Sequence, residues 1–141
     1  MNTETSIRGG HIAIVAAVLF LAVGGYFLMR QMMQPPTQPD LEKGRAVVEA
    51  FLRKVGEGKA GDAWDSSTAE LKSIEGRESF MKRTSAAPLL REPFEFASTQ
   101  DVKVQETPRT EFLYTSAKSG KTVRILVGYE QGEWKVDRLT Y

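Results

Sequence analysis

The chain has 141 residues, and its 19 Lys and Arg nearly balance its 18 Asp and Glu, so the net charge is only +1. This balance, without any basic block, excludes the strongly basic surface typical of nucleic-acid binding. The absence of cysteine excludes disulfide frameworks and lipoprotein processing, and the single histidine, His11, leaves the rest of the chain without histidine chemistry. We therefore expect no nucleic-acid partner, no metal ion and no cofactor.

An uncharged apolar segment runs from Ile12 to Met29. A helix rises about 1.5 Å per residue, so a segment of this length covers most of a hydrocarbon core about 30 Å thick. The one candidate cleavage site, Ala22-Val23-Gly24, would leave an apolar new N-terminus, which is untypical of a secretory signal. We predict an N-terminal tail at 1–11 and a retained transmembrane anchor at 12–30, with the lipid bilayer as a partner.

The residues on either side of the anchor suggest its orientation. Arg8 and the amino terminus precede the apolar segment, and only Arg30 follows it closely, so the positive charge leans slightly toward a cytoplasmic tail and an outward domain. Residues 31–38, rich in proline and glutamine, are expected to form a stiff extended linker. The remaining residues, 39–141, have the usual size of one compact domain.

The first part of this domain has the periodicity of an amphipathic helix. Thr37 and Asp40 have the spacing of a capping box, and Gly56 and Gly58 mark the end of the helix. The apolar residues that recur at helical spacing are Leu41, Val48, Phe51, Leu52 and Val55.

Two further helical segments are predicted after this helix. Residues 60–73 suggest two short turns of helix, the second capped by Ser67 with Glu70 three residues later. Residues 76–87 predict a third helix, which must stop before Pro88.

From Pro93 onward the pattern changes to the alternation typical of strands. Four strands are indicated, with apolar residues at Phe94, Phe96, Val102 and Val104, then Phe112 and Tyr114, then Val123, Ile125, Val127 and Tyr129, and finally Trp134, Val136, Leu139 and Tyr141. The first group is expected to share one face of a long strand. Turn signals separate the strands, so the sequence predicts an α+β protein in which a transmembrane helix precedes three helices packed on a four-stranded antiparallel meander sheet.

The short helical segment "GDAWDSSTAELK", a third helix and the closing hairpin "GYEQGEWKVDRLTY" resemble the nuclear transport factor 2-like superfamily. The resemblance covers about Asp40 to Tyr141 and implies a cone-shaped, cystatin-like sheet wrapped over helices. Enzymes of this superfamily use general acid–base chemistry inside the cone, which requires a desolvated carboxylate or a His–Asp pair.

Acid–base candidates in the domain are few. Asp62 and Asp65 flank Trp64 and could face a pocket, but capping and solvated roles are commoner for such carboxylates. Tyr114, Tyr129 and Tyr141 first suggest strand aromatics and only then hydrogen-bond donors. We therefore expect no catalytic residues, and an isomerase or dehydratase remains the alternative.

The favoured interpretation is a non-catalytic binding or assembly module, an accessory subunit or scaffold of a membrane complex. Its architecture is similar to that of VirB-type assembly factors of type IV secretion, which implies the bacterial inner membrane with the C-terminal domain on the extracytoplasmic side. Trp64, Phe80 and Trp134 are the candidate lining of the cone interior: if they fill it, the domain is a scaffold, and if it is open, it could hold a small apolar ligand.

Two leucines indicate a partner surface. Phe112-Leu113-Tyr114 and Ile125-Leu126-Val127 are unbroken apolar triplets in neighbouring strands, whereas a strand with one solvated face would alternate. Leu113 and Leu126 are therefore expected to be covered, either by a second copy or another membrane protein or, alternatively, by a segment of the same chain.

Overall fold

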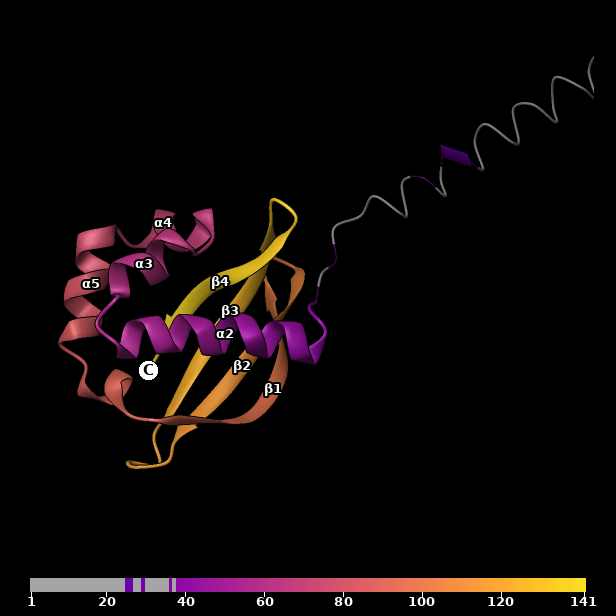
Figure 1. Cartoon of the computed structure of the whole chain (residues 1–141). Helices are drawn as coiled ribbons and strands as arrows, with labels where there is room; N and C mark the ends of the chain where they lie inside the picture. Colours follow the sequence, from indigo (N-terminus) through magenta and orange to yellow (C-terminus); the bar gives the residue numbers. More distant parts are fainter. Residues whose placement is uncertain (1–24, 27–28, 30–35, 37) are drawn as a thin grey trace, which may run out of the picture. The chain divides into compact units, whose positions relative to one another are not determined.

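The structure is a computed structural model that describes residues 25–26, 29, 36 and 38–141 (Figure 1). The predicted tail at 1–11 and nearly all of the anchor at 12–30 and the linker at 31–38 lie outside these residues. Among the helices of the described part, none has the length and apolarity needed to cross a membrane. Residues 36–141 form one compact unit, which is the subject of the following paragraphs.

Helix α2 (Leu41–Gly56) is the longest helix of the described residues. Its N-cap is Asp40, whose carboxylate accepts a hydrogen bond from the backbone N–H of Lys43 at 2.8 Å. The predicted capping box, with Asp40 three residues inside the helix, is therefore wrong: Asp40 is itself the cap, and its carboxylate satisfies a free N–H group of the first turn. The end at Gly56 is confirmed, and Gly58 follows it in the left-handed region.

The region predicted as two short turns and a third helix forms more separate elements. They are α3 (Ala60–Asp65), α4 (Ala69–Ile74), α5 (Arg77–Ser85) and the 3₁₀ helix η1 (Pro88–Arg91). Within residues 38–141 there are thus four α-helices rather than three. The cap of α4 is Thr68 and not Ser67, because the Thr68 hydroxyl accepts the backbone N–H of Leu71 at 3.3 Å.

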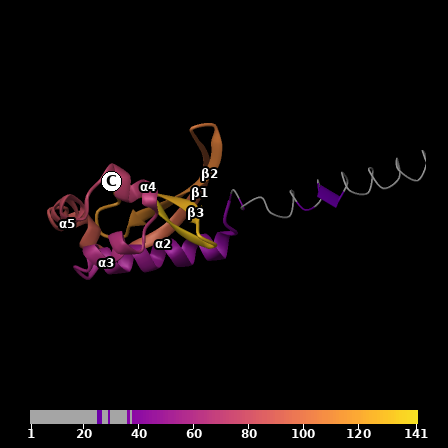
Figure 2. The same ribbon diagram turned by 90° about the horizontal axis from the view of Figure 1, so that it is seen from above.

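The predicted meander is confirmed. Strands β1 (Phe94–Val104), β2 (Thr107–Ser116), β3 (Thr122–Glu130) and β4 (Glu133–Thr140) form one antiparallel sheet in the order β1-β2-β3-β4. Figures 1 and 2 show α2 crossing one face of this sheet, with α3 and α5 beyond one end of the strands. The fold is therefore α+β, with the helices preceding the sheet in the chain.

A β-bulge divides β1 into two parts, and even-numbered residues point to opposite faces of the sheet before and after it. Phe96 is paired with Tyr114, but the register shifts before Ser98, which is paired with Leu113. The extra residue reverses the alternation, so Val102 lies opposite Arg109, on the face away from α2. The expectation that Phe94, Phe96, Val102 and Val104 share one face is therefore wrong.

The core lies between α2 and the sheet. Its members from α2 are Val48, Phe51, Leu52 and Val55, and those from the sheet include Phe112, Tyr114, Val123, Ile125, Val127, Val136 and Leu139. Gly44 allows the closest approach, because a Cβ atom at this position would lie 2.1 Å from Cζ of Phe112. Helix α2 therefore contacts the Phe112 ring at Gly44, the position where the helix has no side chain.

Candidate functional site

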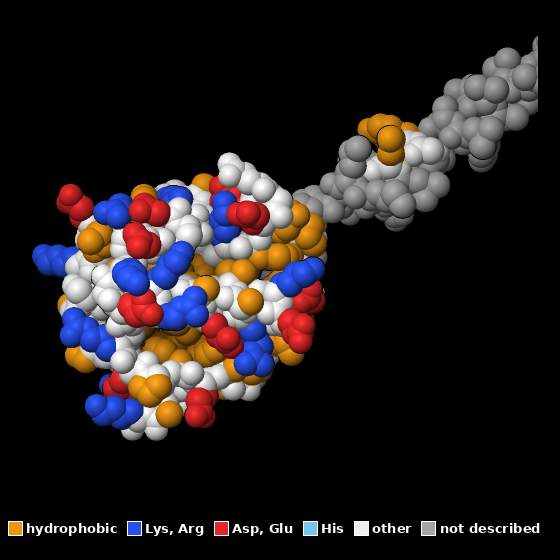
Figure 3. Space-filling view, in the orientation of Figure 1, with side chains coloured by type: hydrophobic (Ala, Val, Ile, Leu, Met, Phe, Trp, Pro, Cys, Tyr) orange, Lys and Arg blue, Asp and Glu red, His pale blue; other side chains and the backbone are white. Residues whose placement is uncertain are grey.

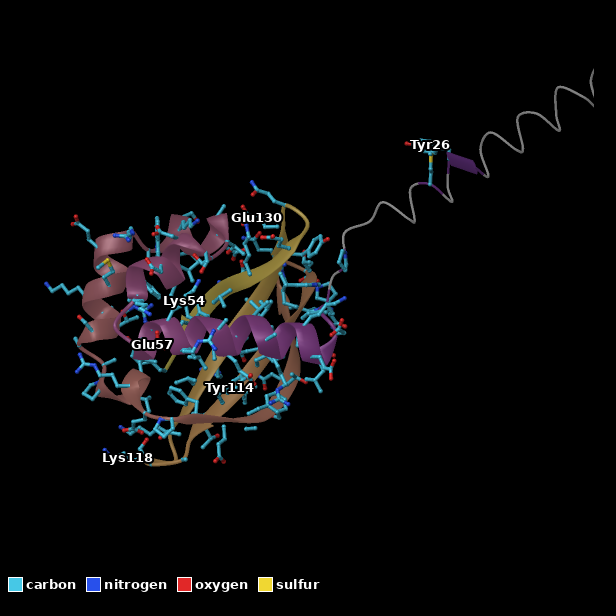
Figure 4. The ribbon with its side chains drawn as sticks, in the orientation of Figure 1. Tyr26, Lys54, Glu57, Tyr114, Lys118 and Glu130 are labelled. Atoms are coloured by element: carbon cyan, nitrogen blue, oxygen red, sulfur yellow. The ribbon has the colours of Figure 1, made fainter. Side chains whose placement is uncertain are left out.

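Two grooves flank α2 on the face of the sheet that this helix covers. The groove on the β1 side, here called the Tyr114 groove, has a volume of about 330 Å³ and is lined by Glu49, Leu52, Arg53, Gly56, Leu90, Glu92, Pro93, Phe94 and Tyr114. The groove on the β4 side, the Trp134 groove, has about 350 Å³ and is lined by Val47, Ala50, Phe51, Lys54, Ser66, Glu133, Trp134, Lys135 and Val136. Figure 3 shows apolar side chains gathered along both sides of the helix, and Figure 4 shows Tyr114 and Lys54 on its opposite sides.

A chain of polar contacts forms one wall of the Tyr114 groove. The Tyr114 hydroxyl donates to Oε1 of Glu49 at 3.2 Å, and the same oxygen accepts from Nε and Nη2 of Arg45 at 3.2 and 3.1 Å. The Arg45 guanidinium also lies 4.7 Å from the ring centre of Phe96. Burial and the neighbouring Glu49 charge raise the pKa of Tyr114 to about 12, so its hydroxyl is a fixed neutral donor that ties β2 to α2.

The rim of the Tyr114 groove carries charges of both signs. Arg53 is exposed and forms no ion pair within residues 38–141. Glu92 accepts from the hydroxyls of Ser116 and Ser119, which lower the pKa of its carboxyl. Because Glu92 is already satisfied by these hydroxyls, Arg53 is the charge at this rim that remains available to a ligand.

The three aromatic residues predicted to line one pocket lie in three different surroundings. Phe80 is fully buried and packs against Phe51, with ring centres 6.1 Å apart. Trp64 is half-buried, and its indole N–H donates to the carbonyl oxygen of Glu75 at 2.8 Å, which ties α3 to the end of α4. Trp134 alone lines a groove, where it packs edge-on against Tyr129 at 5.0 Å. All three belong to or pack against the same core cluster, but neither groove is lined by all three of them.

The two aspartates considered as acid–base candidates are exposed. Asp65 is paired with Arg77, whose Nε lies 3.1 Å from Oδ1, and neither aspartate lines either groove. Tyr129 is half-buried, and the Tyr141 hydroxyl donates to the carbonyl oxygen of Arg83 at 3.2 Å. Glu49 is the carboxylate that a tyrosine hydroxyl does contact, and sequence reasoning missed it because it reads as an ordinary solvated residue of an amphipathic helix.

The leucines expected to face a partner differ in burial. Leu126 has only 3% of its surface exposed in the single chain, whereas Leu113 is half-buried. In the register, Leu126 lies between Glu111 of β2 and Arg138 of β4. That Leu113 and Leu126 contact a partner stays a prediction. Leu126 could contact a partner only if the groups that cover it moved aside.

The sequence analysis also missed a buried carboxylate within strand β4. Asp137 is 2% exposed, its Oδ1 accepts the Thr68 hydroxyl at 2.6 Å, and its Oδ2 has no hydrogen-bond partner among the described residues. It lies at a register shift between β3 and β4 that follows Leu126, next to Gly128. Simple alternation places Asp137 on the solvated face, so the sequence carries no signal of its burial.

Nothing in the described part of the chain forms a metal centre, since no three of its His, Asp and Glu side chains come together in a way that could hold an ion. In comparisons with known proteins, the chain matches no protein-family model and no curated protein.

Proposed function

We propose that the protein is a membrane-anchored, non-catalytic binding module in which a segment of a partner protein lies in the Tyr114 groove. The observation that carries this proposal is the combination of a core of buried apolar side chains with an open, apolar-floored groove beside α2. Apolar residues give such a groove its affinity, and a few polar groups at the rim fix the orientation of what binds. Leu52, Leu90 and Phe94 supply the floor.

Arg53 suggests the chemistry of the bound segment. A guanidinium that has no ion-pair partner within residues 38–141 and lies at the edge of an apolar groove favours an apolar side chain followed by a carboxylate, which Arg can bind with two parallel hydrogen bonds. The partner is accordingly another membrane protein with an acidic, apolar segment near the bilayer. In this proposal the domain belongs to the nuclear transport factor 2-like superfamily, works on the extracytoplasmic side of a bacterial inner membrane, and serves as an accessory subunit of a larger complex.

The second candidate is an acid–base enzyme or a binder of a small apolar ligand. The contact between Tyr114 and Glu49 favours it, because a tyrosine beside a carboxylate can act as a donor toward an enolate. Two features argue for the binding module instead. The Tyr114 hydroxyl is already donated to Glu49, and the Glu49 side chain is about half exposed and paired with Arg45 rather than desolvated.

The proposal is tested by quantitative affinity purification of the full-length chain from detergent-solubilised native membranes. Arg53→Glu reverses the charge at the groove, and Lys82→Glu is the matched control, since Lys82 is an exposed basic residue in the last turn of α5, as Arg53 is in α2. We expect Arg53→Glu to lower the recovery of a specific membrane protein at least about tenfold, the effect of losing one charge-assisted contact and gaining repulsion. Equal recovery with both variants would contradict docking in this groove.

A further inference from the structure

The two edges of the sheet are covered differently. At the β4 edge, the backbone N–H of Thr68 donates to the carbonyl oxygen of Val136 at 3.0 Å, and α4 packs beside the strand. At the other edge, β1 is paired with β2 alone, and no strand of the described residues lies on its far side. Its side chains from Ala97 to Gln100 are exposed, and Figure 2 shows the β1–β2 turn projecting beyond the rest of the sheet.

The turn decides which backbone groups of β1 face this free edge. Val104 is paired with Thr107 across a two-residue turn, Gln105-Glu106, whose φ angles of 48° and 64° are those of a type I′ hairpin. The residues that close such a turn form a hydrogen-bonded pair, and hydrogen-bonded and non-hydrogen-bonded pairs then alternate along the strands. Asp101 and Lys103 therefore direct their backbone N–H and C=O groups away from β2.

These backbone groups have no partner strand among the described residues, and they belong to two residues whose side chains have opposite charge. Asp101 and Lys103 are both exposed, and they flank Val102. A second antiparallel copy of β1 centred on Val102 would set Asp101 opposite Lys103 of the other copy, twice by symmetry. Each of these pairs would exchange two backbone hydrogen bonds and add an ion pair, and Val102 would face its own symmetry mate.

Other registers lack this match. Neighbouring residues of a strand point to opposite faces, so a symmetric pairing must be centred on a residue rather than between two residues. A pairing centred on Asp101 sets two carboxylates opposite each other, and one centred on Lys103 sets two ammonium groups opposite each other. A pairing centred on Gln100 sets Lys103 opposite Ala97, at the bulge, and forms no ion pair.

We propose that two copies of the chain associate through antiparallel pairing of their β1 edges, with the twofold axis at Val102. The amide of Gln38 donates to Oδ1 of Asp101 at 3.1 Å, so the start of each domain lies one residue from the axis. Two chains leaving the same membrane could therefore meet at this point. The pairing is short, so it is weak in dilute solution and depends on the high local concentration of tethered copies. It is independent of the groove proposed above, because it requires no foreign partner.

Cysteine cross-linking tests the axis directly, because the native chain has no cysteine. In a non-hydrogen-bonded pair the Cα atoms are about 4.5 Å apart, within the range of a disulfide. We expect full-length Val102→Cys to form a disulfide-linked dimer on mild oxidation in membranes. Val104→Cys is the matched control: it is on the same face and equally half-buried, but four positions from its symmetry mate, so it should not cross-link. Absence of the Val102→Cys dimer, or equal cross-linking of both variants, would overturn the proposal.

Charge reversal tests the register in the Val102→Cys background. Asp101→Lys or Lys103→Asp alone sets like charges opposite each other, and each should slow cross-linking by at least about fivefold. The double variant restores opposite charges across the axis and should recover the original rate. If the double variant stays as slow as the single variants while its thermal unfolding is unchanged, the two side chains do not face each other and the register is wrong. None of these outcomes depends on whether Arg53 binds a partner.

Discussion

Among the residues that line the Tyr114 groove, Tyr114 itself has the most strongly shifted pKa. Burial and the Glu49 carboxylate raise its pKa to about 12, against about 10 for the side chain in the unfolded chain. The folded state therefore holds this proton more tightly than the unfolded state between these pH values. The contribution of Tyr114 to stability is complete below about pH 10 and is lost as the pH rises through the folded pKa.

This linkage predicts a loss of about 1 to 3 kcal/mol in the free energy of unfolding between pH 9 and pH 12, since one pKa unit corresponds to about 1.4 kcal/mol. Denaturant unfolding at a series of pH values measures it. Tyr114→Phe should remove this part of the alkaline loss. Tyr129→Phe, on the neighbouring strand, is the control, because the Tyr129 hydroxyl forms no hydrogen bond within residues 38–141. If Tyr114→Phe showed the same pH dependence as the wild type, the Glu49 contact would not hold the proton.

At the scale of elements, the position of α2 on the sheet depends on Gly44. Gly44→Ala would place a methyl group 2.1 Å from Cζ of the Phe112 ring, which is fully buried and cannot swing away. Gly61 in α3 is a matched control, because a Cβ atom there meets Nη2 of Arg77, the end of a flexible side chain, at 2.4 Å.

We therefore expect the two alanine substitutions to affect stability differently. Gly44→Ala should lower the free energy of unfolding by about 1 to 3 kcal/mol, because overpacking exceeds the gain in helix propensity. Gly61→Ala should change it little or raise it by up to about 1 kcal/mol, the propensity gain of alanine over glycine. Thermal and urea unfolding measure both. Equal destabilisation by the two variants would mean that helix α2 can shift away from Phe112.

The elements were predictable to the extent that each depends on local pattern. Alternation and turn signals were enough for the meander, and the periodicity of residues 41–55 was enough for α2. The bulge after Phe96 was not predictable, because Val102 and Val104 continue the same alternation in the sequence while the backbone turns them to the other face. The burial of Asp137 was not predictable for the same reason, because Asp137 lies at the second register shift, between β3 and β4.

The candidate site was less predictable than the fold. The three large aromatic residues were predicted to line one pocket. In the structure Phe80 packs in the core, the Trp64 indole is hydrogen-bonded to the end of α4, and only Trp134 lines a groove. The Tyr114 groove is made by residues of α2, η1, β1 and β2, whose meeting depends on the path of the chain between Leu90 and Phe94. No local pattern encodes that path.

At the scale of the whole molecule, one edge of the sheet is covered by α4 and its cap, and at the other edge no further strand of the described residues pairs with β1. The Tyr114 groove lies between α2 and the first residues of β1, whereas the proposed twofold axis lies at the far end of that strand, at Val102. Self-association and partner docking therefore use different parts of β1. A paired copy could hold two grooves, each able to receive a partner segment, which would suit an accessory subunit of a membrane complex.

The remaining prediction concerns the anchor. The segment from Ile12 to Met29 has no charge, and its length at about 1.5 Å per residue nearly matches the hydrocarbon core, so we expect it to be retained in the membrane. Intact mass of the protein extracted from membranes should equal that of the full chain. Leu21→Arg, near the middle of the segment, should lower the membrane-inserted fraction strongly, because a central charge costs about 2.5 to 3.5 kcal/mol. Leu21→Phe, which keeps the segment apolar, should leave insertion unchanged. A mature chain that begins near Gly24 or Gly25 would show that the segment is a cleaved signal. The domain would then not be attached to the membrane, which both the pairing of tethered copies at β1 and the docking of a membrane protein assume.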